Sequence, residues 1–204
     1  MKRGLILLFS AMLGTASLTY AGSGNLKLII DAGHGGTDVG SKSKAGDKES
    51  DICLQIAEAI QDYAKENGIA TEMTRTRKKE TLSFDQRSGH KAEPGVKTFY
   101  ISVHFDEDKK DPSVHGARVR YSDHAHYSNE SRKLAQAIAQ SLDKINNTPT
   151  KIETVDAIVF MKNDMPAIMV EPGRMNSAQD VKNIKEKDYR KEVAMYIVQA
   201  AMNQ

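Results

Sequence analysis

Cysteine is almost absent from this sequence. The chain of 204 residues contains one cysteine, Cys53, so an intramolecular disulfide is excluded. The fold must therefore be held together by its hydrophobic core. Cys53 falls on the apolar side of a predicted helix, which favours buried packing over a role as a catalytic nucleophile.

The sequence also has little excess charge of either sign. Its formal net charge is +2, and the first 21 residues contribute two basic side chains and no acidic one. The remaining chain therefore carries 27 basic and 27 acidic side chains. Nucleic-acid-binding domains are usually clearly basic, so we expect no nucleic-acid partner. We interpret the short basic run at residues 75–79 as a solvated loop.

Long apolar runs are lacking beyond the first residues of the chain. Residues 5–13 form an apolar stretch that Ser10 interrupts, two basic residues precede it, and small residues lead on to Ala21. A membrane-spanning helix needs about 20 apolar residues, whereas this order is typical of a secretory signal peptide. We predict that residues 1–21 are a signal peptide and that residues 22–204 form one exported domain, periplasmic or secreted to the cell wall, without a transmembrane segment.

Short β-branched segments alternate with longer segments of helical period. The predicted strands are residues 26–31, 69–74, 98–103, 117–122, 156–161 and 167–171. The predicted helices are residues 50–67, 83–92, 128–145 and 187–202. This alternation predicts an α/β fold: a single three-layer domain with a mostly parallel or mixed sheet of about six strands flanked by helices.

Four side chains with metal or acid–base chemistry lie at comparable places in this pattern. His34 sits in a glycine-rich turn after the first predicted strand, and His104 follows the third. Glu171 ends the last predicted strand, and Glu49 precedes the first helix. Pockets of such sheets form at the carboxyl ends of strands. Two imidazoles and a carboxylate suit zinc, and a second carboxylate can serve as the base of a hydrolase.

Taken singly, each of these residues has an ordinary structural explanation. A turn histidine, a strand-end histidine, a carboxylate in the first turn of a helix and a surface acid are all common. The metal site is predicted from the joint pattern. The other histidines lie in polar segments without ligand spacing and are left out of the site; they are His90, His115, His124 and His126.

Four motifs occur in an order that resembles a known enzyme family. They are residues 28–36 (LIIDAGHGG), 49–57 (ESDICLQIA), 101–104 (ISVH) and 168–173 (IMVEPG). The chain resembles, over nearly everything after the signal peptide, the zinc-dependent N-acetylmuramoyl-L-alanine amidases of the type 3 family. This resemblance implies that His34, Glu49 and His104 hold Zn²⁺ and that Glu171 is the catalytic carboxylate.

The resemblance also implies a reaction and a substrate. The expected enzyme is a peptidoglycan hydrolase that uses zinc-activated water to cleave the amide bond between N-acetylmuramic acid and the L-alanine of the stem peptide. Peptidoglycan or muropeptides would be its binding partner, and we expect a monomer. Two other functions stay open: a zinc hydrolase of another exported amide or peptide, and a non-catalytic glycan-binding module. The latter would be expected to lack a ligand or the glutamate.

The sequence departs from the family pattern after the last motif. Arg174 follows Pro172 and Gly173, where a glycine followed by phenylalanine is common in the family. Because a guanidinium binds carboxylates through two parallel hydrogen bonds, we predict that Arg174 is a substrate-binding residue for a stem-peptide carboxylate. A solvated loop arginine is the alternative.

Overall fold

A computed structural model describes residues 25–204 except 109–110, 112 and 146–147. The predicted signal peptide lies outside the described residues and stays a prediction. The strands are β1 (Leu26–Ala32), β2 (Ala70–Met73), β3 (Lys97–Val103), β4 (Arg118–Tyr121), β5 (Lys151–Thr154) and β6 (Ala167–Glu171). The helices are α1 (Glu49–Glu66), α2 (Phe84–Arg87), α3 (Ser128–Leu142), α4 (Ile158–Met161), α5 (Ala178–Lys185) and α6 (Lys187–Met202).

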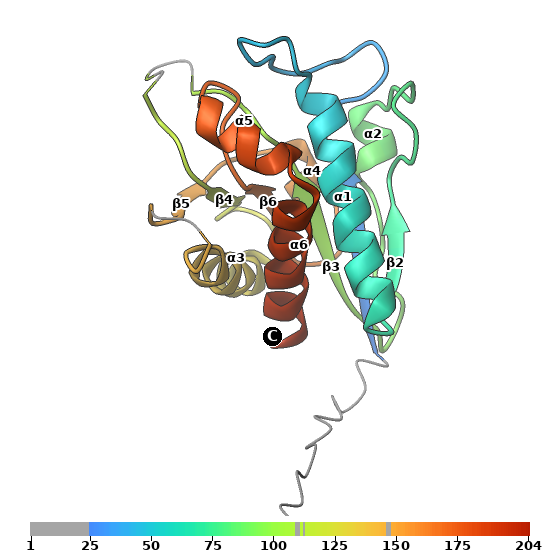
Figure 1. Ribbon diagram of the computed structural model, residues 1–204. Helices are drawn as coiled ribbons and strands as arrows, with labels where there is room; N and C mark the ends of the chain where they lie inside the picture. Colours follow the sequence, from blue (N-terminus) through green and yellow to red (C-terminus); the bar gives the residue numbers. More distant parts are fainter. Residues whose placement is uncertain (1–24, 109–110, 112, 146–147) are drawn as a thin grey trace, which may run out of the picture.

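The strands form one mixed sheet in the order β2-β1-β3-β6-β4-β5. Strands β2, β1, β3 and β6 run parallel to one another, whereas β4 pairs with β6 in the antiparallel direction. The edge strand β5 runs parallel to β4. The predicted α/β fold, a single domain with a six-stranded, mostly parallel or mixed sheet between helices, is therefore confirmed (Figure 1).

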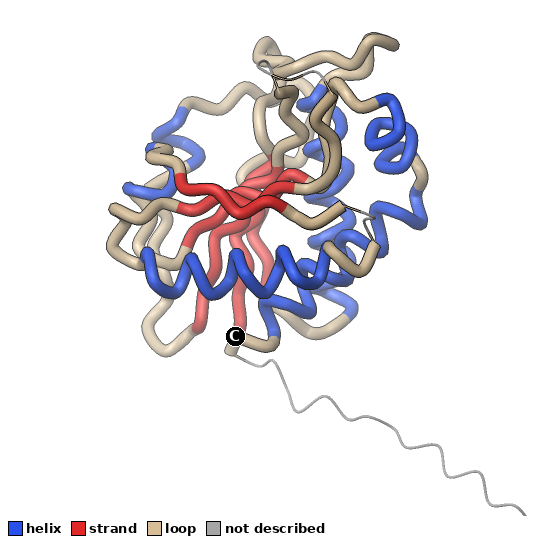
Figure 2. Tube along the Cα trace, turned by 90° about the vertical axis from the view of Figure 1, so that its left-hand side faces the viewer, coloured by secondary structure: helices blue, strands red, loops and turns tan. Residues whose placement is uncertain are grey.

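The two faces of the sheet are covered unequally. Helices α1, α3 and α6 pack on one face, where Leu28, Ile30 and their neighbours form the larger core. The alternate residues, such as Ile29 and Tyr100, point to the other face and pack against α4 in a smaller cluster. Figure 2 shows the twisted sheet with long helices on one side and short ones on the other.

Helix α1 follows its sequence pattern closely. Its buried stripe includes Ile52, Cys53, Ile56 and Ile60, as the spacing of apolar residues predicts. Gly68, with a φ of 72°, lets the chain turn back into β2 after the helix ends. The buried position of Cys53 agrees with the prediction that it packs in the core.

Three secondary-structure predictions need correction. The strand predicted at residues 156–161 is wrong, because 158–161 form the one-turn helix α4 and the edge strand is β5. This short apolar run has no decisive period: Val159 and Phe160 are buried while the residues on either side are exposed. The helix predicted at 83–92 is reduced to α2, and α5 was not predicted. Among the described residues, no helix has both the length and the apolar character needed to cross a bilayer.

The topology brings distant residues to one edge. Strands β1, β3 and β6 are neighbours and parallel, so their carboxyl ends meet there. Strand β4 is antiparallel to β6 and starts at this edge, with Arg118 directly opposite Glu171. The loop from β1 to α1, blue in Figure 1, and helix α5 lie at the same end of the sheet.

Candidate active site

The loop after β1 brings an imidazole close to other groups, and glycine makes this approach possible. His34 itself has a φ of 57°, a value that non-glycine residues rarely adopt. A Cβ atom on Gly33 would lie 2.6 Å from Cε1 of His104, and one on Gly40 would lie 2.6 Å from Oε2 of Glu49. Side chains are therefore excluded at both glycines, and the metal-binding candidates can gather around them.

A buried carboxylate anchors the start of this loop. Asp31 accepts hydrogen bonds from the hydroxyls of Thr74 at 2.7 Å and Ser102 at 2.8 Å, and from Nη1 of Arg87 at 2.8 Å. Burial by itself would raise the pKa of Asp31, but the charge of Arg87 and the two hydroxyl hydrogen bonds lower it. Asp31 thus remains a charged anchor directly before the turn.

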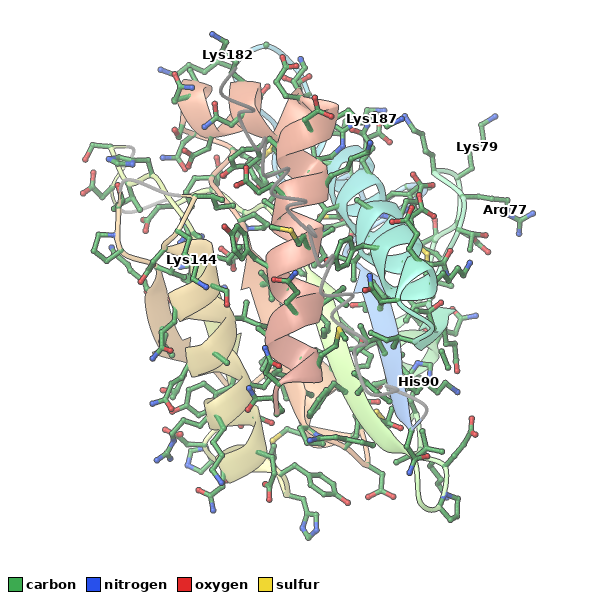
Figure 3. The ribbon with its side chains drawn as sticks, turned by 60° about the horizontal axis from the view of Figure 1, so that its bottom comes forward. Arg77, Lys79, His90, Lys144, Lys182 and Lys187 are labelled. Atoms are coloured by element: carbon green, nitrogen blue, oxygen red, sulfur yellow. The ribbon has the colours of Figure 1, made fainter. Side chains whose placement is uncertain are left out.

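Two arginines hold the carbonyl groups of the same loop. Arg75 donates to the carbonyls of Ala32 at 2.9 Å and Gly33 at 2.8 Å. Arg87 donates to the carbonyls of Ala32 at 2.8 Å and His34. Arg75 is buried, so the interpretation of residues 75–79 as a solvated loop is wrong for this residue. Its neighbours Arg77 and Lys79 do extend outward (Figure 3).

The structure brings His34, Glu49 and His104 together, as predicted. Nε2 of His34 lies 3.2 Å from Oε1 of Glu49, and Nδ1 of His104 lies 3.0 Å from the same oxygen. One donor atom from each residue can be chosen so that all three lie within 4.8 Å of one another. A tetrahedral zinc site with bonds of about 2.0 Å places its ligands about 3.3 Å apart. The two distances to Glu49 are close to this value, so the three residues form a candidate metal site whose donor types suit zinc.

Neighbouring groups fix the orientation of these ligands. Nδ1 of His34 lies 2.9 Å from Oδ2 of Asp38, a residue that sequence reasoning did not identify. Glu49 accepts backbone hydrogen bonds from Ser41 at 2.9 Å and Phe105 at 3.1 Å. Carboxylate and backbone partners of this kind typically orient metal ligands.

Electrostatics in this group favour a charged carboxylate among imidazoles. Burial by itself would lower the pKa of His34, but hydrogen bonds to Glu49 and Asp38 and their charges raise it to about 9. For Glu49, burial would raise the pKa, but hydrogen bonds and charges of His104 and His34 lower it. The group thus already contains the anion that a metal cation would bind.

Glu171 is buried beside these ligands and is surrounded by three guanidinium groups. Arg118 donates to its Oε2 from Nη2 at 2.7 Å and from Nε at 3.0 Å, and Nη1 of Arg174 contacts the same oxygen. Nη1 of Arg120 lies 3.1 Å from Oε1. Among the described residues, Oε1 has no aligned hydrogen bond.

The arginines on β4 were missed by sequence reasoning. Arg118 and Arg120 are two residues apart on a predicted strand, so the period of two places them on one face. Their charge partner could not be read from that signal, because it depends on β4 pairing with β6 in the register that opposes Arg118 and Glu171.

Arg174 reaches the site in an unexpected way. Its side chain is 1 % exposed and contacts Glu171, so the alternative of a solvated loop arginine is wrong. Its role as a substrate contact stays a prediction. A cavity of about 380 Å³ is lined by the His–Glu–His group, Glu171 and Arg120, among other residues.

These features agree with the comparisons with known proteins. The model of the N-acetylmuramoyl-L-alanine amidase family matches residues 28–203, which include all four predicted site residues. The chain therefore belongs to the family of N-acetylmuramoyl-L-alanine amidases, enzymes that hydrolyse the amide bond between N-acetylmuramic acid and L-alanine in peptidoglycan. As a member of this cell-wall family it acts outside the cytoplasm.

Individual relatives are distant in sequence. A germination-specific N-acetylmuramoyl-L-alanine amidase of Bacillus subtilis is 26% identical over an alignment of 186 positions, gaps included, that covers 83% of this chain and 76% of the relative. The amidase AmiC of Escherichia coli is 23% identical over an alignment of 212 positions, gaps included, that covers 84% of this chain and 51% of the length of AmiC. These relatives are similar to the chain over most of its described residues.

Solved structures show the same fold. The crystal structure of an N-acetylmuramoyl-L-alanine amidase from Clostridium difficile 630 matches with a TM-score of 0.78 and 24% identity, covering 89% of this chain and 97% of that one. The amidase AmiC2 of Nostoc punctiforme matches with a TM-score of 0.72 and 23% identity, covering 89% and 98%. At these identities the likeness concerns the fold alone.

Proposed function

We propose that this chain is a zinc-dependent peptidoglycan amidase in which His34, Glu49 and His104 hold Zn²⁺ and Glu171 transfers the protons. The observation that carries this proposal is Oε1 of Glu171. This oxygen is buried, has no aligned hydrogen bond among the described residues, and belongs to a residue that lines one cavity with the three ligands.

The three ligands have separate tasks. His34 and His104 supply imidazole nitrogens, and the hydrogen bond of His34 to Asp38 keeps one ring nitrogen directed at the site. Glu49 supplies the negative charge that offsets part of the cation. Bound zinc would supply Lewis acidity, which polarises an amide carbonyl and makes water more acidic.

Glu171 would act as base and then as acid. Its Oε2 is occupied by Arg118 and Arg174, which orient the carboxylate. Oε1 is left to accept the proton of the attacking water and to pass it to the leaving alanine nitrogen. One oxygen therefore serves orientation and the other serves proton transfer.

Digestion of purified peptidoglycan tests this assignment. The zinc-loaded chain should release stem peptides with a free L-alanine amino group and should create no new glycan ends, as mass spectrometry would show. A chelator should abolish release and added zinc should restore it. Released peptides that still carry muramic acid, or full activity after the metal has been removed, would contradict the proposal.

We also propose that the chain reaches the periplasm or cell wall through removal of residues 1–21. Basic, apolar and small residues follow one another in the order of a signal peptide. The mature protein recovered from the expressing cell should begin at Gly22 when its amino terminus is sequenced. A chain that keeps its first residues and stays in the cytoplasm would refute this.

A further inference from the structure

The guanidinium groups around Glu171 outnumber the carboxylates. Arg118, Arg120 and Arg174 face two acids, Glu171 and the half-exposed Glu153. This cluster of five side chains therefore carries a net formal charge of +1. An unbalanced cation beside a catalytic cavity is suited to bind an anionic group of a substrate.

Arg120 is the member of the cluster that is available for such a group. Each nitrogen of Arg118 already has a carboxylate partner, with Nε and Nη2 on Glu171 and Nη1 on Glu153 at 3.2 Å. Arg174 is buried against Glu171. Arg120 has a side chain that is 20 % exposed, lines the cavity, and donates from Nε to Glu153 at a long 3.4 Å. Its Nη2 has no hydrogen bond to any described residue.

The position of Arg120 relative to Glu171 fixes what it can reach. Resting on the proposed function, the leaving alanine nitrogen must lie beside Oε1 of Glu171, and Nη1 of Arg120 is 3.1 Å from that oxygen. The residue after L-alanine in a stem peptide is an acidic one, and its Cα lies about 3.8 Å from that of alanine. Its α-carboxylate is thus the first anionic group beyond the cleaved bond.

We infer that Arg120 binds the free α-carboxylate of the acidic residue that follows L-alanine, and so selects stem peptides in which this group is not amidated. A guanidinium presents paired N–H donors that match a carboxylate, whereas a carboxamide offers one acceptor oxygen and no charge. Arg120 is therefore a specificity-determining residue of the amidase.

Two synthetic substrates test this inference. N-acetylmuramoyl-L-Ala-γ-D-Glu-L-Lys-amide and its D-isoglutamine counterpart differ in the α-carboxylate alone. The zinc-loaded chain should cleave the acid with a KM about tenfold or more below that for the amide, the range expected of a charge-assisted hydrogen bond. Arg120→Gln should remove this preference, so that the acid and the amide are cleaved with the same KM.

Variants distinguish binding from positioning. Arg120→Lys keeps the charge but loses the paired donors, so it should retain part of the preference for the acid; it also serves as the test variant if Arg120→Gln does not fold. Arg132→Gln removes the same charge from an exposed position on α3 and should leave both substrates unaffected. An equal fall of kcat on both substrates in Arg120→Gln, with the KM preference for the acid retained, would overturn the inference and make Arg120 a positioning residue for Glu171.

Binding of the free peptides separates this inference from the proposed function. L-Ala-γ-D-Glu-L-Lys-amide and its D-isoglutamine form lack the bond that the enzyme cleaves, and calorimetry on the zinc-loaded chain measures them directly. Tighter binding of the acid that disappears in Arg120→Gln would support Arg120 even if no muropeptide were cleaved, in which case the proposed function alone would fail. Equal binding of both peptides would overturn the role of Arg120, whether or not cleavage occurred.

Discussion

Two glutamates that line one cavity have different surroundings. Glu49 sits between two imidazoles and accepts backbone hydrogen bonds, on the side built by β1, β3 and the start of α1. Glu171 sits among three guanidiniums, on the side built by β6 and the antiparallel β4. Both carboxylates are buried, yet their partners differ in kind.

The difference shows how one site gives two carboxylates two roles. The partners of Glu49 can exchange a proton for a metal ion, because an imidazole nitrogen is a good ligand once deprotonated. The partners of Glu171 are permanently charged and cannot bind a metal. The surroundings of Glu49 are thus suited to take up a cation, and the surroundings of Glu171 are suited to hold and orient a base. Environment, more than residue type, assigns the roles.

Removal of a metal ligand should have the largest effect, because it destroys the group of side chains that would bind the cation. We expect His34→Ala to lose both zinc, normally about one per chain, and all peptide release. Atomic absorption after dialysis and the digestion assay measure the two properties. His124→Ala, at an exposed histidine paired with Asp156, is the matched control and should keep both.

Glu171→Gln should remove the proposed base and leave the three metal ligands intact. The amide keeps the size of the side chain but cannot accept a proton, so kcat should fall about 10²- to 10⁴-fold while zinc content stays unchanged. Glu153→Gln, which alters a half-exposed acid of the same cluster, should lose far less activity. Loss of zinc in Glu171→Gln would show that the two glutamates do not have separate roles.

Asp38→Ala should have a smaller effect, because it weakens the metal-binding group without removing a ligand. The partner of Nδ1 of His34 is lost, and zinc affinity should fall about 10- to 100-fold. A competition titration with a chromophoric chelator measures this change. Asp85→Ala, at an exposed acid on α2, provides the control, and an equal affinity in both variants would rule out an orienting role for Asp38.

A pair of glycine substitutions isolates the smallest effect, that of close packing around the ligands. Gly40 and Gly46 both have positive φ, at 63° and 88°. Only a Cβ on Gly40 would meet the ligands, at 2.6 Å from Glu49, whereas one on Gly46 would meet nothing within 4 Å. Each alanine variant should lose about 1 kcal/mol through backbone strain. Gly40→Ala should show an additional fall in melting temperature and zinc content, and equal losses in both variants would argue against the close approach.

Much of the site could be predicted from the sequence because its ligands follow strand ends. A glycine-rich turn, two strand-end positions and a helix start are local patterns, and the carboxyl ends of parallel strands necessarily meet at one edge. Helices α1, α3 and α6 were predictable for a similar reason, since their apolar periods are long. Short segments failed: residues 158–161 carry too few positions for a period of two to be told from one of 3.6.

The contacts of the arginines with Glu171 could not be predicted from the sequence. The sequence by itself determined that His34, Glu49, His104 and Glu171 stand at equivalent positions, because secondary structure and strand ends are encoded locally. Only the tertiary structure decided that Arg118, 53 residues from Glu171, binds it, and that Arg120 faces the cavity while Arg174 is buried. The physical reason is that strand order, direction and register result from the packing of the whole sheet, and no local pattern specifies them.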